Sequence, residues 1–82
     1  MNKKEVSTNR IVREILSRKD PAGYYVVVAI NSTELKEILN RYKYGDIIVE
    51  DIGGITIIRS KTRKIVELLT RELVSKKLLA DT

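Results

Sequence analysis

The sequence predicts a small α+β domain, in which a three-stranded sheet is covered by helices in the element order α-β-α-β-β-α. The first indication is "YYVVVAI", residues 24–30, a wholly apolar run of aromatic and β-branched residues that is typical of a buried strand. The second is "DIIVEDIGGITIIRS", residues 46–60, which has the pattern of a β-hairpin turning at Gly53-Gly54. The third is the helical spacing of apolar residues before, between and after these strands. All 82 residues are therefore expected to form one domain.

The first helix is expected to begin at Ser7 or Thr8, whose hydroxyl groups are good N-caps, and to run to about Arg18. Residues 1–6 are then expected to be a flexible N-terminal end. Pro21 ends the helix, because the residue before a proline is disfavoured in helical conformation. One side of this helix carries the apolar residues Ile11, Val12, Ile15 and Leu16.

Residues 24–30 are expected to be the central strand, because a strand that is apolar throughout is usually buried on both faces. A second helix follows over residues 31–42. Either Asn31 begins it with a capping box or Ser32 caps it instead, and Gly45 is the expected stop. Its buried side is formed by Leu35, Ile38, Leu39 and Tyr42.

A β-hairpin and a long last helix form the C-terminal half. The helix is expected to run from about Lys61 to Leu79 and to pack on the sheet. Glu67 and Arg71 are four residues apart and can pair on its outer side. In the hairpin, the two-residue turn places Ile52 opposite Ile55 and Val49 opposite Ile58.

The composition limits how such a short chain can be stabilised. There is no cysteine and no histidine, so we expect no disulfide, no metal site and no cofactor. A chain of 82 residues then depends on a well-packed core or on self-association. The core material is aliphatic, with 11 Ile, 8 Val and 8 Leu, and 33% of the residues are charged. This combination fits a thermophilic source, and the alternative is a mesophilic genome rich in lysine and isoleucine.

Both faces of the hairpin carry isoleucine, although a sheet packed on one side alternates apolar and polar residues. One face can hold two helices, so the other is covered by the third helix or by a second copy of the chain. We expect a two-fold homodimer, because Val74 and Leu78 lie away from the main apolar stripe of the last helix. The alternative is a three-layer monomer. The expected interface residues are Ile55, Ile57, Val74 and Leu78.

The net charge of +5 and the pI of about 9.6 favour an anionic partner. Cations gather where the hairpin meets the last helix, and more follow on the outer faces of the first and last helices. Together they predict phosphate contacts with nucleic acid, duplex DNA being favoured over RNA. The alternative is an ordinary solvated surface. The expected contacts are Arg59, Lys61, Arg63 and Lys64, extended by Arg71, Arg10 and Arg13.

Catalysis is not expected. Without histidine and cysteine, the usual general bases and thiol nucleophiles are missing. Glu50 and Asp51 are consecutive in a strand, so they point to opposite faces and do not converge on a metal. Among the tyrosines, only Tyr44 is expected to be free to stack on a base.

The segment "YGDIIVEDIGGITIIRSKTRKI" resembles the wing hairpin of winged-helix DNA-binding domains. That fold has two adjacent helices before the wing, whereas here the strand at residues 24–30 precedes a single helix. The resemblance is limited to the hairpin pattern and covers about a quarter of the chain.

The sequence therefore predicts a small basic nucleic-acid-binding protein that acts as a homodimeric architectural, regulatory or accessory factor. The alternative is a protein–protein interaction module that uses an exposed isoleucine-rich sheet face. No apolar run is long enough to span a membrane and no signal-peptide pattern is present, so a cytoplasmic location is expected.

Overall fold

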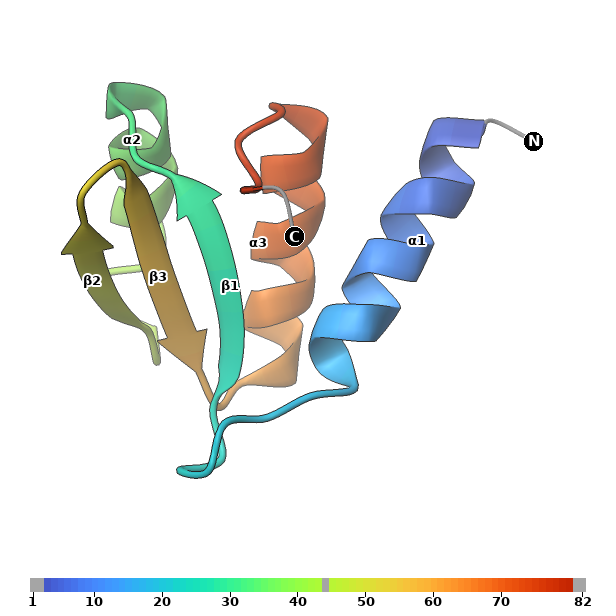
Figure 1. The fold of residues 1–82 in the computed structure, drawn as a ribbon, viewed down its shortest axis with the longest axis horizontal. Helices are drawn as coiled ribbons and strands as arrows, with labels where there is room; N and C mark the ends of the chain where they lie inside the picture. Colours follow the sequence, from blue (N-terminus) through green and yellow to red (C-terminus); the bar gives the residue numbers. More distant parts are fainter. Residues whose placement is uncertain (1–2, 44, 81–82) are drawn as a thin grey trace.

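The computed structural model describes residues 3–43 and 45–80, with side chains from residue 8 onward. It has the predicted α+β architecture and the predicted order of elements, with the last helix packed on the sheet (Figure 1). The elements are α1 (Lys3–Leu16), β1 (Tyr25–Ile30), α2 (Thr33–Asn40), β2 (Ile48–Ile52), β3 (Ile55–Ser60) and α3 (Arg63–Ser75).

The sheet has the strand order β1-β3-β2, and both outer strands run antiparallel to β3. The prediction that residues 24–30 form the central strand was therefore wrong, because β1 lies at an edge. The side chains of β1 are apolar on both faces for another reason. One face contributes to the core, and the other lines a groove beside α1. The hairpin register is confirmed, with the pairs Ile52–Ile55 and Val49–Ile58.

The three helices form one layer on one side of the sheet. Figure 1 shows α2 behind the strands, α3 next to the β1 edge, and α1 on the far side of α3. Ion pairs join α2 to α3, one between Arg41 and Glu72 and one between Lys76 and Glu34. The core between the two layers contains Tyr25, Val27 and Ala29 of β1, Ile58 of β3, Leu35, Ile38 and Leu39 of α2, and Val66, Leu69 and Leu73 of α3.

The helix boundaries differ from the predictions in three places. Helix α1 begins at Lys3 rather than Ser7, because lysine and glutamate are good helix formers and nothing before Ser7 interrupts the helix. Residues 3–6 are therefore helical. Helix α2 is capped by Ser32, whose hydroxyl accepts the Leu35 N–H at 3.1 Å, as the second alternative predicted. It ends at Asn40, so Gly45 is not its stop.

Helix α3 ends at Ser75 rather than Leu79, because the chain forms a Schellman motif there. The Leu78 N–H bonds to the Leu73 carbonyl at 2.8 Å, and the Lys77 N–H bonds to the Val74 carbonyl at 3.1 Å. Lys77 adopts the left-handed conformation with φ of 60°, which is strained for a residue with a Cβ.

This C-cap redirects the residues that follow it. Leu78 enters the core and is only 8% exposed, so the expectation that it lies on the polar side of a continuing helix was wrong. Leu79 forms an antiparallel bridge with Ala29, which places residues 78–80 along the edge of β1.

We expect Lys77→Gly to stabilise the fold by about 0.5–1 kcal/mol, since glycine adopts a positive φ without the Cβ clash. Chemical denaturation measures this change. The matched control is Lys76→Gly at φ of −91°, where glycine adds chain entropy and also removes the exposed ion pair with Glu34, so the stability should fall. A loss of stability in Lys77→Gly would contradict the strain assigned to this cap.

Candidate interaction surfaces

The sheet presents one face to the helices and one away from them. Alternate residues of a strand point to opposite faces, and the buried residues of β1 and β3 identify the inner side. We call the opposite side the outer sheet face. It is a grid of three rows across the strands: Val26, Arg59 and Ile48; Val28, Ile57 and Glu50; and Ile30, Ile55 and Ile52.

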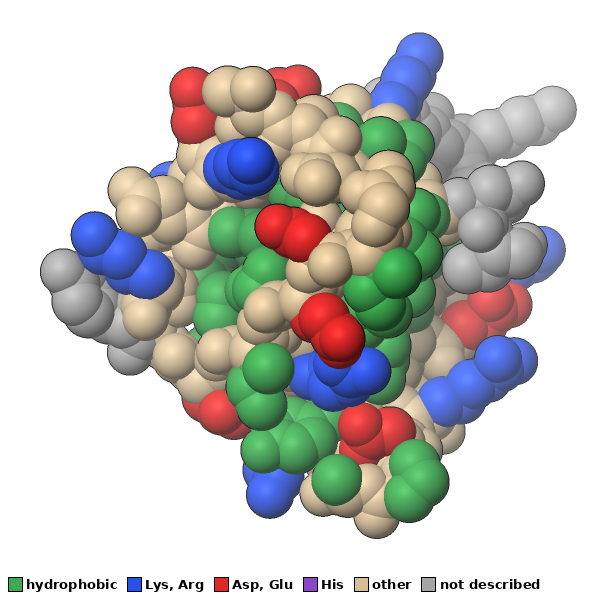
Figure 2. Space-filling model, turned by 60° about the vertical axis from the view of Figure 1, so that its left-hand side comes forward, with side chains coloured by type: hydrophobic (Ala, Val, Ile, Leu, Met, Phe, Trp, Pro, Cys, Tyr) green, Lys and Arg blue, Asp and Glu red, His purple; other side chains and the backbone are tan. Residues whose placement is uncertain are grey.

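Seven of the nine residues of the outer sheet face are aliphatic. Four of these are clearly exposed, with Ile30 at 44%, Ile48 at 45%, Ile52 at 49% and Ile55 at 38%. Within residues 3–43 and 45–80, no helix crosses this face (Figure 1). Figure 2, in which the β2 side comes forward, shows hydrophobic side chains at the surface beside a small group of acidic and basic ones. The third helix therefore does not cover the second face of the sheet.

Arg59 is the only cation of the outer sheet face, and it is already engaged. Its guanidinium lies 3.1 Å from a Glu50 carboxylate oxygen and 3.7 Å from one of Asp20. Asp20 also accepts the backbone N–H groups of Ala22 and Tyr24, each at 2.9 Å. The charge of Arg59 is thus balanced by two carboxylates, and its role is to fasten the loop before β1 to the central strand.

Three other predicted cations gather where β3 passes into α3, and we call them the α3 basic cluster: Lys61, Arg63 and Lys64. The Lys61 ammonium lies over the ring of Tyr24, 4.9 Å from its centre. Arg63 and Lys64 are exposed, and no described residue pairs with them. Asp46 lies nearby and accepts the backbone N–H of Lys61 at 3.0 Å. The cluster therefore faces solvent with one carboxylate beside it.

The remaining predicted cations lie on the helix layer. Arg71 pairs with Glu67 at 3.5 Å, as predicted, and also donates to the Asn9 side chain at 2.9 Å, which joins α3 to α1. Arg10 and Arg13 are exposed on α1. Arg59 points instead to the outer sheet face, so the predicted cations do not form one continuous strip.

None of the described tyrosines has a ring that is free to stack on a base. Tyr24 lies under Lys61, and buried Tyr25 has the Lys19 ammonium 5.1 Å from its ring centre. Burial and the nearby Glu72 carboxylate raise the pKa of Tyr42, partly offset by Arg41, so its phenol stays neutral at physiological pH. Tyr44, the predicted stacking residue, lies outside the described residues.

The acidic residues of the hairpin, Glu50 and Asp51, form hydrogen bonds to side chains of β3. Glu50 bonds Arg59 on the outer face, whereas Asp51 accepts the Thr56 hydroxyl at 2.8 Å on the inner one. They point to opposite faces, as predicted. In the described part of the chain, no three acidic side chains come together in a way that could hold a metal ion.

None of the helices in the described part of the chain is long and apolar enough to cross a membrane.

Comparisons of the chain with protein families, with curated proteins and with solved structures find no match.

We expect Asp20→Ala to cost about 2 kcal/mol of unfolding free energy, because two backbone N–H groups lose a charged acceptor and Arg59 loses a partner. The control is Glu50→Gln, which removes only an exposed ion pair and should cost less than about 1 kcal/mol. Thermal or urea unfolding measures both. Equal, small effects would show that Asp20 does not organise this loop.

Proposed function

We propose that this protein is a protein-interaction module whose outer sheet face self-associates into a two-fold dimer. The observation that carries the proposal is the grid of seven aliphatic residues that no described helix covers. Contiguous apolar patches of this kind mark interaction sites on soluble proteins, since burying them is favourable by roughly 25 cal/mol per Å².

A second copy is the occupant that fits this face most simply. With the two-fold axis along the strands, β3 lies over its counterpart, so that Ile55 and Ile57 each meet the same residue of the other copy. The charges of Arg59 and Glu50 do not oppose this arrangement, because they are already paired within each chain. A chain of 82 residues without cysteine also gains stability from such burial.

The size of the face sets the expected affinity. Three strands about 4.8 Å apart, with three outward residues on each, give a patch of roughly 14 by 20 Å. A stable interface buries about 800 Å² on each partner, so this patch is the centre of the interface rather than all of it. We therefore expect a dimer that dissociates on dilution.

The test is the mass in sedimentation velocity over a concentration series. The wild type should approach twice 9.4 kDa at high concentration, and Ile55→Lys should remain at 9.4 kDa. The matched control is Leu68→Lys, since Leu68 is similarly exposed, at 46%, but lies on the helix layer. A wild type that stays monomeric to millimolar concentration, or an Ile55→Lys variant that still dimerises, would refute the proposal.

A second candidate function is phosphate binding to duplex DNA, and the α3 basic cluster carries it. Lys61 lies just before α3, and Arg63 and Lys64 lie in its first turn, where backbone N–H groups and the helix dipole also favour an anion. Such contacts hold a protein to the nucleic-acid backbone without reading its sequence. The dimer would then act as an architectural, regulatory or accessory factor.

Fluorescence anisotropy of a labelled DNA duplex at several salt concentrations tests this second function. Three phosphate contacts predict that the affinity falls by roughly 40-fold between 50 and 200 mM salt. The double variant Arg63→Ala, Lys64→Ala should weaken binding and reduce the salt dependence, whereas Lys36→Ala on α2 should not. An absence of binding at 50 mM salt would exclude the duplex DNA function.

A further inference from the structure

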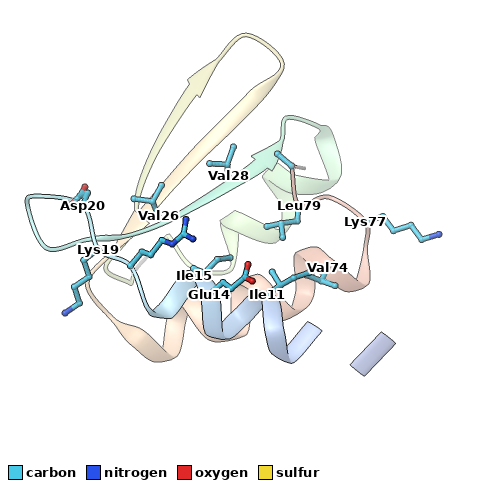
Figure 3. Close-up of a pocket in the computed structure, with 12 residues that line it drawn as sticks. Ile11, Glu14, Ile15, Lys19, Asp20, Val26, Val28, Val74, Lys77 and Leu79 are labelled. Atoms are coloured by element: carbon cyan, nitrogen blue, oxygen red, sulfur yellow. The ribbon is translucent and has the colours of Figure 1, made fainter. Parts of the chain in front are cut away.

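A groove of about 620 Å³ lies between α1 and the edge of β1 (Figure 3). We call it the α1–β1 groove. Its apolar lining comes from four separate parts of the chain, which explains why no local sequence pattern predicts it. These residues are Ile11 and Ile15 of α1, Val26 and Val28 of β1, Val74 of α3, and Leu79.

The edge of β1 that borders this groove is only partly paired. The backbones of Tyr24, Val28 and Ile30 all bond on the side away from β3. The Tyr24 carbonyl accepts the Asp20 N–H at 2.8 Å, the Val28 carbonyl accepts the Ala80 N–H at 2.9 Å, and the Ile30 N–H donates to the Leu78 carbonyl at 2.7 Å.

Because backbone groups alternate in direction along an antiparallel strand, Val26 also points its N–H and C=O away from β3. No described group bonds to either of them. Among the described residues, the Val26 backbone therefore offers the groove one free donor and one free acceptor between two positions that are already paired. The gap from Tyr24 to Val28 leaves room for about three residues of extended chain, or roughly 10 Å.

The rim of the α1–β1 groove is positive. It carries Glu14, Arg18, Lys19, Asp20 and Lys77. The Asp20 carboxylate is already used by backbone N–H groups and by Arg59. The other four are three cations and one anion, so acidic groups complement this rim.

We propose that the α1–β1 groove binds an extended peptide segment of a partner protein, which pairs as a short strand with Val26. A strand satisfies the free N–H and C=O of Val26 together, as an antiparallel pair does, whereas a helix has no backbone groups to offer along its side. The segment is apolar at its centre, where the lining is aliphatic, and acidic at its ends, where the rim is positive. The α1–β1 groove shares Val26 and Val28 with the outer sheet face, but this proposal rests on the backbone of Val26 and needs no second copy of the chain.

The probe is the synthetic peptide acetyl-Glu-Val-Ile-Val-Glu-amide, titrated into the full ¹⁵N-labelled chain and followed by amide NMR. We expect saturable shifts at Val26 and at residues 78–80. The matched probe carries an N-methyl group on the central isoleucine, which removes its donor. It should bind at least roughly tenfold more weakly if the hydrogen-bonded pair holds the peptide.

Ile11→Lys, which places a cation among the lining residues, should abolish the shifts, and Arg10→Ala on the same helix should not. Three results would overturn the proposal: no saturable shift at millimolar peptide, equal binding of the N-methyl peptide, or shifts confined to β2 and β3. Binding by a chain ended at Ala80, without binding by the full chain, would also overturn it, because the groove would then be closed to a partner.

Discussion

The structure depends on the packing of α3 against the inner face of the sheet. Val66, Leu69 and Leu73 are at most 2% exposed and fill the space behind β1 and β3. With α3 in this place, α2 and α1 pack on either side of it, and ion pairs and the Arg71–Asn9 bond hold this helix layer together. All three helices are used on one face, so the other face of the sheet keeps its isoleucines at the surface.

The end of α3 has a similar influence on the β1 edge. The left-handed residue Lys77 turns the chain back, so that Leu78 enters the core and residues 78–80 pair with part of β1. Within the described residues this pairing does not reach Val26, and the loop held by Asp20 bonds to the strand only at Tyr24. A single C-cap thus shapes both the core and the gap in the α1–β1 groove.

The sequence predicted what local geometry determines. The glycine pair of the hairpin predicted the register of β2 and β3, Ser32 was one of two predicted caps, and the i,i+4 spacing predicted the Glu67–Arg71 pair. The sequence did not predict that β1 is an edge strand. A strand can be apolar on both faces when it is central in the sheet and also when it lies at an edge beside an apolar groove. The end of α3 was missed because no glycine or proline marks it. The ion pair between Arg59 and Asp20 was not predicted, because these two residues are far apart in the sequence and only the folded chain brings them together.

The most direct test of this account is the solvent accessibility of individual isoleucine methyl groups, measured with a soluble nitroxide and methyl-labelled protein. The account predicts that the methyl groups of Ile30, Ile52 and Ile55 are shielded at high protein concentration and become accessible on dilution. The methyl groups of Leu68 should remain accessible throughout. If the three isoleucines are as accessible as Leu68 at every concentration, no second copy covers the outer sheet face, and the proposed self-association is wrong.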